Sequence, residues 1–233
     1  MTSSAMLADM TNFLPFLLGM IHAREWTAFE RFALSNPETF KCISDLISEC
    51  AELNGMTLLH ACVRYDPPVS VLLKMIELCP ESLRRKDCIG RTPLHVAAGS
   101  GASLSVLKIL TTMYPNACSI QDEDGRTPLH FACDTDCELF EEDEESSPRE
   151  PPSLDTVYIL LAGSLHAVTL EDDDDMNAVE YALLANAPIE VVTVLQKAMQ
   201  EVIHIKRSKD NVSAQCSPRP CPSTAIMSRI AST

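Results

Sequence analysis

Apolar residues recur along this chain at helical spacing, in groups separated by a constant distance. One group lies between residues 71 and 76, and its counterpart begins 35 residues later; the members are Val71, Leu72, Met75 and Ile76, then Val106, Leu107, Leu110 and Thr111. Neighbouring apolar pairs four residues apart are typical of a helix that buries one face. Pro80 and Pro115 follow the two groups and cannot continue a helix. The pattern therefore predicts equivalent amphipathic helices.

A short polar motif precedes each of these helices and repeats at the same distance. The letters G-R-T-P-L-H occupy both Gly90–His95 and Gly125–His130, and a looser copy, G-M-T-L-L-H, occupies Gly55–His60. Self-similarity with a period of 35 residues is typical of a stacked repeat array. A fourth, degenerate copy places Asp175 in the glycine position, 50 residues after Gly125. About fifteen residues are therefore inserted in the third unit, within 134–152.

The segments Thr92–Ala97 and Thr127–Ala132 both have the pattern T-P-L-H-x-A, which resembles the signature of the ankyrin repeat. The resemblance implies an all-α solenoid of stacked helix pairs with short turn connections. It also implies that His60, His95 and His130 form hydrogen bonds around the turn that link each repeat to its neighbour. Glu180 replaces this histidine in the fourth unit, which places that link in doubt there.

The repeat frame divides the chain into expected segments. We expect a flexible N-terminus over 1–17, and a capping helix pair over 18–53 with helices at about 20–34 and from Pro37 onward. A cap is needed because the end of a stack otherwise exposes apolar surface. The repeats are expected at 54–87, 88–122, 123–172 with the acidic insert 134–152, and 173–200. The Ser/Pro-rich residues 201–233 are expected to be disordered.

Single residues within the motif have expected local roles. Threonine before the first helix can cap it with its hydroxyl group, and proline is tolerated at the first helical position. Gly55, Gly90 and Gly125 share a turn position where a positive φ is expected, and Gly99 and Gly101 stand where the first helix of the second repeat should end.

Charge is concentrated in two places. The formal net charge is −15, and the insert carries nine carboxylates against Arg149 alone, while Glu171–Asp175 adds five more. A strongly acidic chain lacks the basic field that nucleic-acid binding needs. The sequence instead favours a protein partner with a basic surface, attracted to the C-terminal half. A solubilising loop without a partner is the alternative for the insert.

Catalytic, cofactor and metal chemistry has little support in the sequence. The ten cysteines form no C-x-x-C pair, and Cys62 and Cys133 occupy core positions, so we expect reduced thiols in an intracellular compartment, cytoplasmic or nuclear. The spacing of Asp173, Asp175 and Asn177 resembles a calcium loop, but Ala178 and Leu184 stand where such a loop needs Gly and Glu. No phosphate-binding glycine motif or nucleophile elbow is present. We therefore expect no cofactor, no metal, no small-molecule substrate and no enzymatic activity.

No apolar stretch has the length of a membrane span, and the short patch at residues 13–21 has no preceding Lys or Arg, as a secretory signal would have. A membrane location is therefore not expected.

The family resemblance implies partner binding through the turn tips and the concave face of the first helices. Carried over by position, the candidate contact residues are Met56, Arg64, Cys88, Ile89, Arg91, Ser100, Glu123, Asp124, Arg126, Asp134, Asp173 and Asp174, with Val63, Thr135 and Met176 beside them. These positions predict a non-catalytic interaction scaffold or adaptor. The alternative is a regulatory protein switched by phosphorylation at Ser147 or Ser217, each followed by proline, or by oxidation of Cys88.

Overall fold

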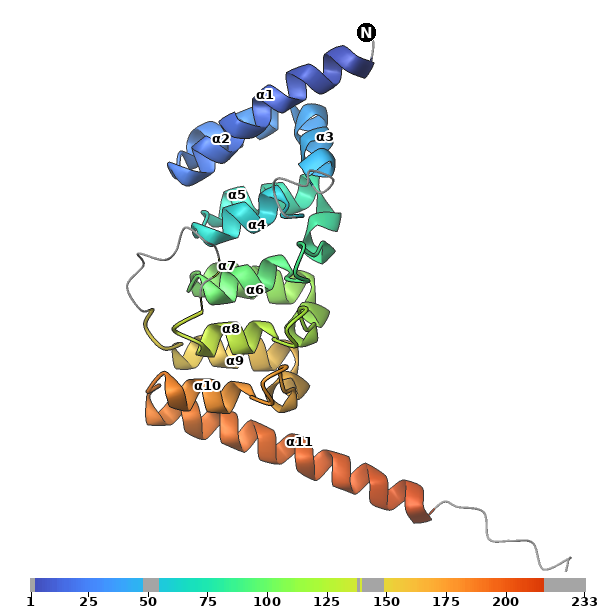
Figure 1. The fold of residues 1–233 in the computed structure, drawn as a ribbon, viewed down its shortest axis with the longest axis vertical. Coiled ribbons are helices and arrows are strands. Elements are labelled where there is room, and N and C mark those ends of the chain that lie inside the picture. The colour runs from blue at the N-terminus through green and yellow to red at the C-terminus, as the bar shows by residue number, and fades with distance from the viewer. Residues whose placement is uncertain (1–2, 48–54, 138, 140–148, 216–233) are drawn as a thin grey trace, which may run out of the picture.

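A computed structural model describes residues 3–47, 55–137, 139 and 149–215 of the chain. The described residues form helices stacked in a single column, with one isolated β-bridge between Glu171 and Asn177 (Figure 1). The predicted all-α solenoid of helix pairs is confirmed. Each pair buries its faces against its neighbours, as in other linear repeat arrays.

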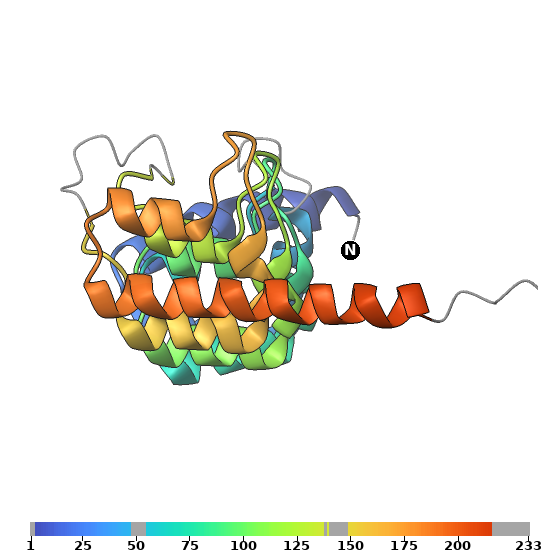
Figure 2. The ribbon, with the colours of Figure 1, turned by 90° about the horizontal axis from the view of Figure 1, so that it is seen from below.

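Four helix pairs make up the repeats in the described part of the chain. They are α4 (Leu58–Arg64) with α5 (Val69–Leu78), α6 (Pro93–Gly99) with α7 (Leu104–Met113), α8 (Pro128–Cys133) with α9 (Leu154–Gly163), and α10 (Ala178–Leu184) with α11 (Ile189–Gln215). First helices contact first helices, and second helices contact second helices, along the whole column. Figure 2, seen along the column, shows these as two layers with the turns gathered on one side.

The second helices carry the core that the apolar pattern predicts. Both predicted groups are buried, as are their counterparts Val157, Leu160, Leu161, Val191, Val192 and Leu195. A short 3-10 helix follows each of the first three second helices: η2 (Pro80–Arg84), η3 (Pro115–Ser119) and η5 (Leu165–Thr169). The two prolines begin η2 and η3, which confirms that each ends the preceding α-helix.

The N-terminal cap differs from the expected helix pair. It contains three helices, α1 (Ser3–His22), α2 (Trp26–Ser35) and α3 (Pro37–Ile47), so the expected flexible segment 1–17 is helical from Ser3. The expected helix over 20–34 is interrupted at Arg24, whose φ of 55° belongs to the left-handed region. Helix α1 contacts α4, and α2 contacts α5, so these two continue the column while α3 packs beside them. The apolar residues of α1 are not confined to one helical face, so the helix lacks the periodic pattern that would have identified it.

The C-terminal boundary also differs from the expected one. Helix α11 continues to Gln215, whereas disorder was expected from residue 201. Ala198 is the last buried residue among the side chains of α11 that are described, and Met199 and Val202 pack partly against the core. The helix then extends past the column (Figure 1). Residues 216–233 of the expected tail lie outside the described residues.

A glycine in the left-handed region forms the turn of each of the first three repeats. The φ values are 71° at Gly55, 81° at Gly90 and 77° at Gly125, and Asp175 takes the same conformation, with φ 58°, in the fourth. An added Cβ on Gly125 would lie 2.9 Å from the Cα of Asp172 in the following turn. Among the described residues no further turn packs against Asp175, so a side chain is sterically tolerated there.

Replacing Asp175 by glycine is expected to stabilise the chain. An L-residue other than glycine loses about 1–2 kcal/mol in the left-handed region, less for Asp than for most residues, and the greater chain entropy of unfolded glycine offsets about 0.5–1 kcal/mol of this. We expect Asp175→Gly to raise the free energy of unfolding by about 0.5 kcal/mol in urea titrations followed by circular dichroism. Asp175→Asn removes the same charge but keeps the Cβ, so an equal gain in Asp175→Asn would contradict a backbone origin.

Candidate protein-interaction surface

The turn before the first helix of a repeat is here called a tip, and in the second, third and fourth repeats one aspartate holds it. The Oδ1 atom of Asp87 accepts hydrogen bonds from the backbone N–H groups of Ile89, at 3.2 Å, and Arg91, at 2.8 Å. Asp122 does the same for Asp124 and Arg126, and Asp172 for Asp174 and Met176. An aspartate that accepts from the backbone two residues on stabilises a tight turn. The tips are therefore ordered by their own sequence.

Consecutive tips are also joined to one another through the backbone. The N–H of Glu123 donates to the carbonyl oxygen of Ile89 at 2.9 Å, and that of Asp173 donates to Asp124 at 2.9 Å. The side chains at the turn remain outside this ladder. Six candidate residues are exposed along it: Cys88, Ile89, Glu123, Asp124, Asp173 and Asp174. The tips thus present one continuous row of exposed side chains on a fixed backbone.

Three histidines connect the tips to the first helices. In each, Nδ1 accepts the backbone N–H of the capping threonine at 3.0–3.1 Å, so Nε2 carries the proton and donates. Each histidine has an acceptor in the next repeat: Arg91 O for His60, Arg126 O for His95 and Met176 O for His130. His95 also lies 3.1 Å from Ile120 O, at the end of its own repeat. The predicted link between neighbouring repeats is confirmed. The last link reaches across the inserted residues, which confirms the offset of 50.

Burial keeps these histidines neutral. It lowers the pKa of His60 to about 4 and that of His95 to about 3, and it lowers the pKa of His130 as well. A charged imidazole would lose solvation that two or three hydrogen bonds do not replace. The histidines therefore act as structural donors at neutral pH, each serving a separate pair of repeats.

The fourth repeat keeps the cap but not the link. Glu180 accepts the backbone N–H of Asn177 at 2.8 Å, and the Oδ1 of Asn177 accepts from Val179 and Glu180 in return. Glu180 is exposed. The doubt about its role is resolved: it closes a capping box within its own helix.

The two arginines of the repeated motif lie in different surroundings. Arg91 is only 7 % exposed, and its Nε donates to Asp87 Oδ2 at 2.7 Å, so this candidate residue lies below the surface of the tip. Arg126 is half-buried and extends toward the next repeat. It pairs with Asp134 at 3.0 Å and Asp172 at 3.6 Å, and it donates to the Tyr181 hydroxyl at 2.8 Å. Buried and multiply bonded, Arg91 stabilises the fold and is not part of the exposed row at the tips.

The aspartates of the third and fourth tips, Asp122 and Asp172, differ in whether their Oδ2 atom has a hydrogen-bond partner. The Oδ2 of Asp172 accepts from the Tyr181 hydroxyl at 2.6 Å. Burial acts to raise the pKa of Asp172, but the hydrogen bonds from Tyr181 and the backbone lower the pKa overall. The Oδ2 of Asp122 is buried and has no hydrogen-bond partner within the described part of the chain, and burial raises the pKa of this group.

The remaining candidate positions are less open than expected. Met56, Arg64, Ser100, Asp134 and Thr135 are partly buried. Val63 is fully buried, which contradicts its expected place on the concave face, and every residue of α6 and α8 is buried. Short first helices packed between two neighbours leave little open side, and part of what remains is covered by the insert.

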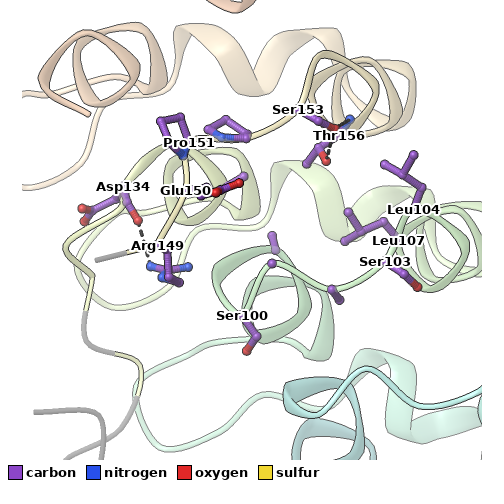
Figure 3. A pocket seen from close by; sticks show the side chains of 15 residues that line it. Ser100, Ser103, Leu104, Leu107, Asp134, Arg149, Glu150, Pro151, Ser153 and Thr156 are labelled. Carbon is purple, nitrogen blue, oxygen red and sulfur yellow. Dashed lines mark hydrogen bonds between the residues drawn. The ribbon is translucent and has the colours of Figure 1, made fainter. Parts of the chain in front are cut away.

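The start of the insert folds back over the first helices. Leu139 is 7 % exposed and contacts the core, and its carbonyl oxygen accepts from Arg91 Nη1 at 2.6 Å. Arg149 at the other end donates from Nη2 to the carbonyl oxygen of Asp134 at 2.8 Å (Figure 3). It also donates from Nη2 to the carbonyl oxygen of Cys137 at 3.1 Å. Neither residue was singled out as a contact from the sequence. A single leucine among carboxylates and a lone arginine were the only signals.

A hollow of about 400 Å³ lies next to the base of the insert (Figure 3). The turn between α6 and α7 forms one wall, and Arg149–Pro152 with the start of α9 form the other. The middle of the acidic insert, residues 140–148, lies outside the described residues, as do Glu138, Ser147 and Ser217. Cys88, the candidate for oxidation, is exposed at its tip.

The described residues offer no new candidate for a reactive thiol, a metal site or a membrane span. Burial raises the pKa of the Cys62 thiol, that of Cys118 to about 11 and that of Cys133 to about 12. Within residues 3–47, 55–137, 139 and 149–215, His, Cys, Asp and Glu side chains form no group of three or more that could hold a metal ion. Over the same residues, no helix combines the length and apolar character needed to cross a membrane.

Comparison with known proteins identifies part of the column. Residues 69–142 match the family model described as ankyrin repeats (3 copies), which covers α5 to α8 and the start of the insert. No curated protein matches the chain.

Proposed function

The chain contains ankyrin repeats, which form a family of protein–protein interaction domains, and from this premise we propose that it is a non-catalytic scaffold or adaptor. It binds a protein partner through the row of tips. The supporting observation is the ladder that joins Ile89 to Glu123 and Asp124 to Asp173. Because the tip backbone is already ordered, binding immobilises few additional groups, and less of the interaction free energy is lost to ordering.

The partner presents a basic surface at the C-terminal half of the row. Exposed carboxylates increase along the tips, from none at Cys88 and Ile89 to Glu123 and Asp124, and then to Glu171 and Asp173–Asp175. The insert adds a further net charge of −8 by sequence. Clustered charge of one sign accelerates association with an oppositely charged surface and makes the rate depend on salt.

Reversing the charge of the last tip tests this proposal. The full chain is used to capture its partner, and association of the purified pair is then measured by stopped flow at low and at physiological salt. We expect Asp173→Lys/Asp174→Lys to slow association about tenfold at low salt and to flatten its salt dependence.

A matched control separates the tip from net charge. Glu190→Lys/Glu201→Lys changes two exposed carboxylates of α11 by the same total charge, and its association rate should stay within about twofold of wild type. Equal slowing in both variants would attribute the effect to overall charge, and no slowing in the tip variant would remove the tips from the binding surface.

A further inference from the structure

Leu139 fills a second space, separate from the hollow in Figure 3 and here called the Leu139 hollow, which a glycine and an aromatic ring form. Gly99, the last residue of α6, has no side chain, and a Cβ added there would lie 2.9 Å from Cδ2 and 3.2 Å from Cδ1 of Leu139. The same added atom would lie 3.1 Å from Cδ1 of Phe131 in α8. The methyl groups of Leu139 therefore fill the space that a side chain at position 99 would occupy.

Larger residues occupy the equivalent position in the other repeats. Arg64 and Asp134 stand 35 residues before and after Gly99, and Leu184 stands in the fourth repeat. Gly99 does not adopt a positive φ, so its backbone does not require glycine. Room for an added aliphatic side chain is therefore a property of the second repeat.

The buried guanidinium group of Arg91 binds the main chain of Leu139. Arg91 Nη1 donates to the carbonyl oxygen of Leu139 at 2.6 Å, while Asp87, whose side chain is fully buried, holds Arg91 Nε at 2.7 Å. A hydrogen bond from a charged donor is stronger than one between neutral groups. One aliphatic side chain and one carbonyl oxygen are what any extended peptide presents at a single residue.

A short segment connects α8 to Leu139, and hydrogen bonds from Arg149 hold that segment in place. Leu139 follows α8 by six residues, and Arg149 closes the loop through the carbonyl oxygens of Asp134 and Cys137 and through its own N–H to Thr135 at 3.4 Å. Arg149 is only partly buried. Its hydrogen bonds to the carbonyl oxygens of Asp134 and Cys137 are therefore open to exchange with water.

We propose that Arg91, Gly99 and Phe131 form a peptide-binding subsite for a leucine-sized aliphatic residue in an extended segment of a partner protein, and that Leu139 occupies this subsite until the partner displaces it. The proposal rests on the proposed scaffold function and adds the class of residue that the partner inserts.

Opening the subsite in the full chain tests the proposal without the partner. The probe is a capped synthetic peptide of residues 135–139 with serine at the cysteine position, titrated into ¹⁵N-labelled protein by NMR. We expect Leu139→Ala to bind it with a Kd in the millimolar range, with shifts centred on the Arg91 and Gly99 amides. Wild type should bind at least tenfold more weakly, because the tethered Leu139 competes at a high effective concentration.

Three controls make the result specific to the Leu139 hollow. Leu73→Ala, which truncates an exposed leucine of α5, should behave as wild type. Adding Gly99→Ala to Leu139→Ala refills the Leu139 hollow and should abolish binding. A peptide with aspartate in place of leucine should not bind Leu139→Ala.

Two results would overturn the subsite. One is equal peptide binding by wild type and Leu139→Ala, or shifts away from α6. The other is a wild-type dimer in light scattering that Leu139→Ala dissociates, because a second copy would then be the occupant. Either result leaves the tip-reversal experiment untouched, so a failure of the subsite is distinguishable from a failure of the scaffold function.

Discussion

Acidification from pH 7 to pH 5 is expected to lower the free energy of unfolding by about 4 kcal/mol, from His60 and His95 together. Both histidines ionise near pH 6.5 when unfolded, and burial lowers the pKa of His60 to about 4 and of His95 to about 3 in the fold. The unfolded chain therefore binds more protons between these values. The stability is fully present above pH 6.5 and is lost as the pH falls toward 4 and then 3.

Urea titrations at constant ionic strength, followed by circular dichroism, measure this dependence. His95→Gln should reduce the loss between pH 7 and pH 5 to about 2 kcal/mol, since one of the two groups is gone. His204→Ala, at an exposed position of α11, should leave the pH dependence unchanged. Constant stability down to pH 4, followed by unfolding as carboxylates protonate, would contradict a role for the histidines.

The sequence predicts the repeated contacts well because each depends on residues close together in the motif. Thr92 and His95 are three residues apart, and the acceptor of His95, the carbonyl of Arg126, holds the same register in the next copy. Periodicity therefore specifies the link twice, once within a repeat and once between repeats. The same reasoning places Asp175 in the left-handed turn despite the change of residue.

The arginines of the two identical motifs nevertheless have different side-chain partners, which the repeat pattern does not predict. Arg91 and Arg126 both follow a turn glycine, but Arg91 meets its own aspartate and the insert, whereas Arg126 meets Asp134, Asp172 and Tyr181. Those partners come from the insert and from the degenerate fourth repeat. Side-chain environment at such positions depends on non-repeated parts of the chain, which a period cannot describe.

The covered part of the candidate surface was missed for the same reason. Leu139 lies in an acidic segment without periodicity, and its burial depends on the space at Gly99, for which the sequence offered a different role at the end of the helix. The composition of the insert predicted solvent exposure. Leu139 packs opposite Gly99, and hydrogen bonds from Arg91 and Arg149 hold the described residues around it.

Neutralising Asp87 at the second tip is expected to lower the free energy of unfolding, whereas neutralising Asp122 at the third tip is expected not to lower it. Asp87→Asn removes the carboxylate from an ion pair in which Arg91 is 7 % exposed, and it should cost about 3 kcal/mol, because a buried guanidinium is left without its counterion. Asp122→Asn keeps the Oδ1 acceptor for two backbone N–H groups and removes the charge of a buried carboxylate. It should leave stability at pH 7 unchanged or raise it.

The two substitutions form a matched pair, since each changes one atom at the same position of adjacent repeats. Urea titrations at pH 7 measure both, and the double variant should show the sum of the single effects because the sites share no side-chain partner among the described contacts. Equal losses in the two variants would mean that the turn needs its aspartate charge in every repeat. A loss confined to Asp87→Asn instead places the stabilisation in the Arg91 ion pair, the same group that holds the carbonyl of Leu139.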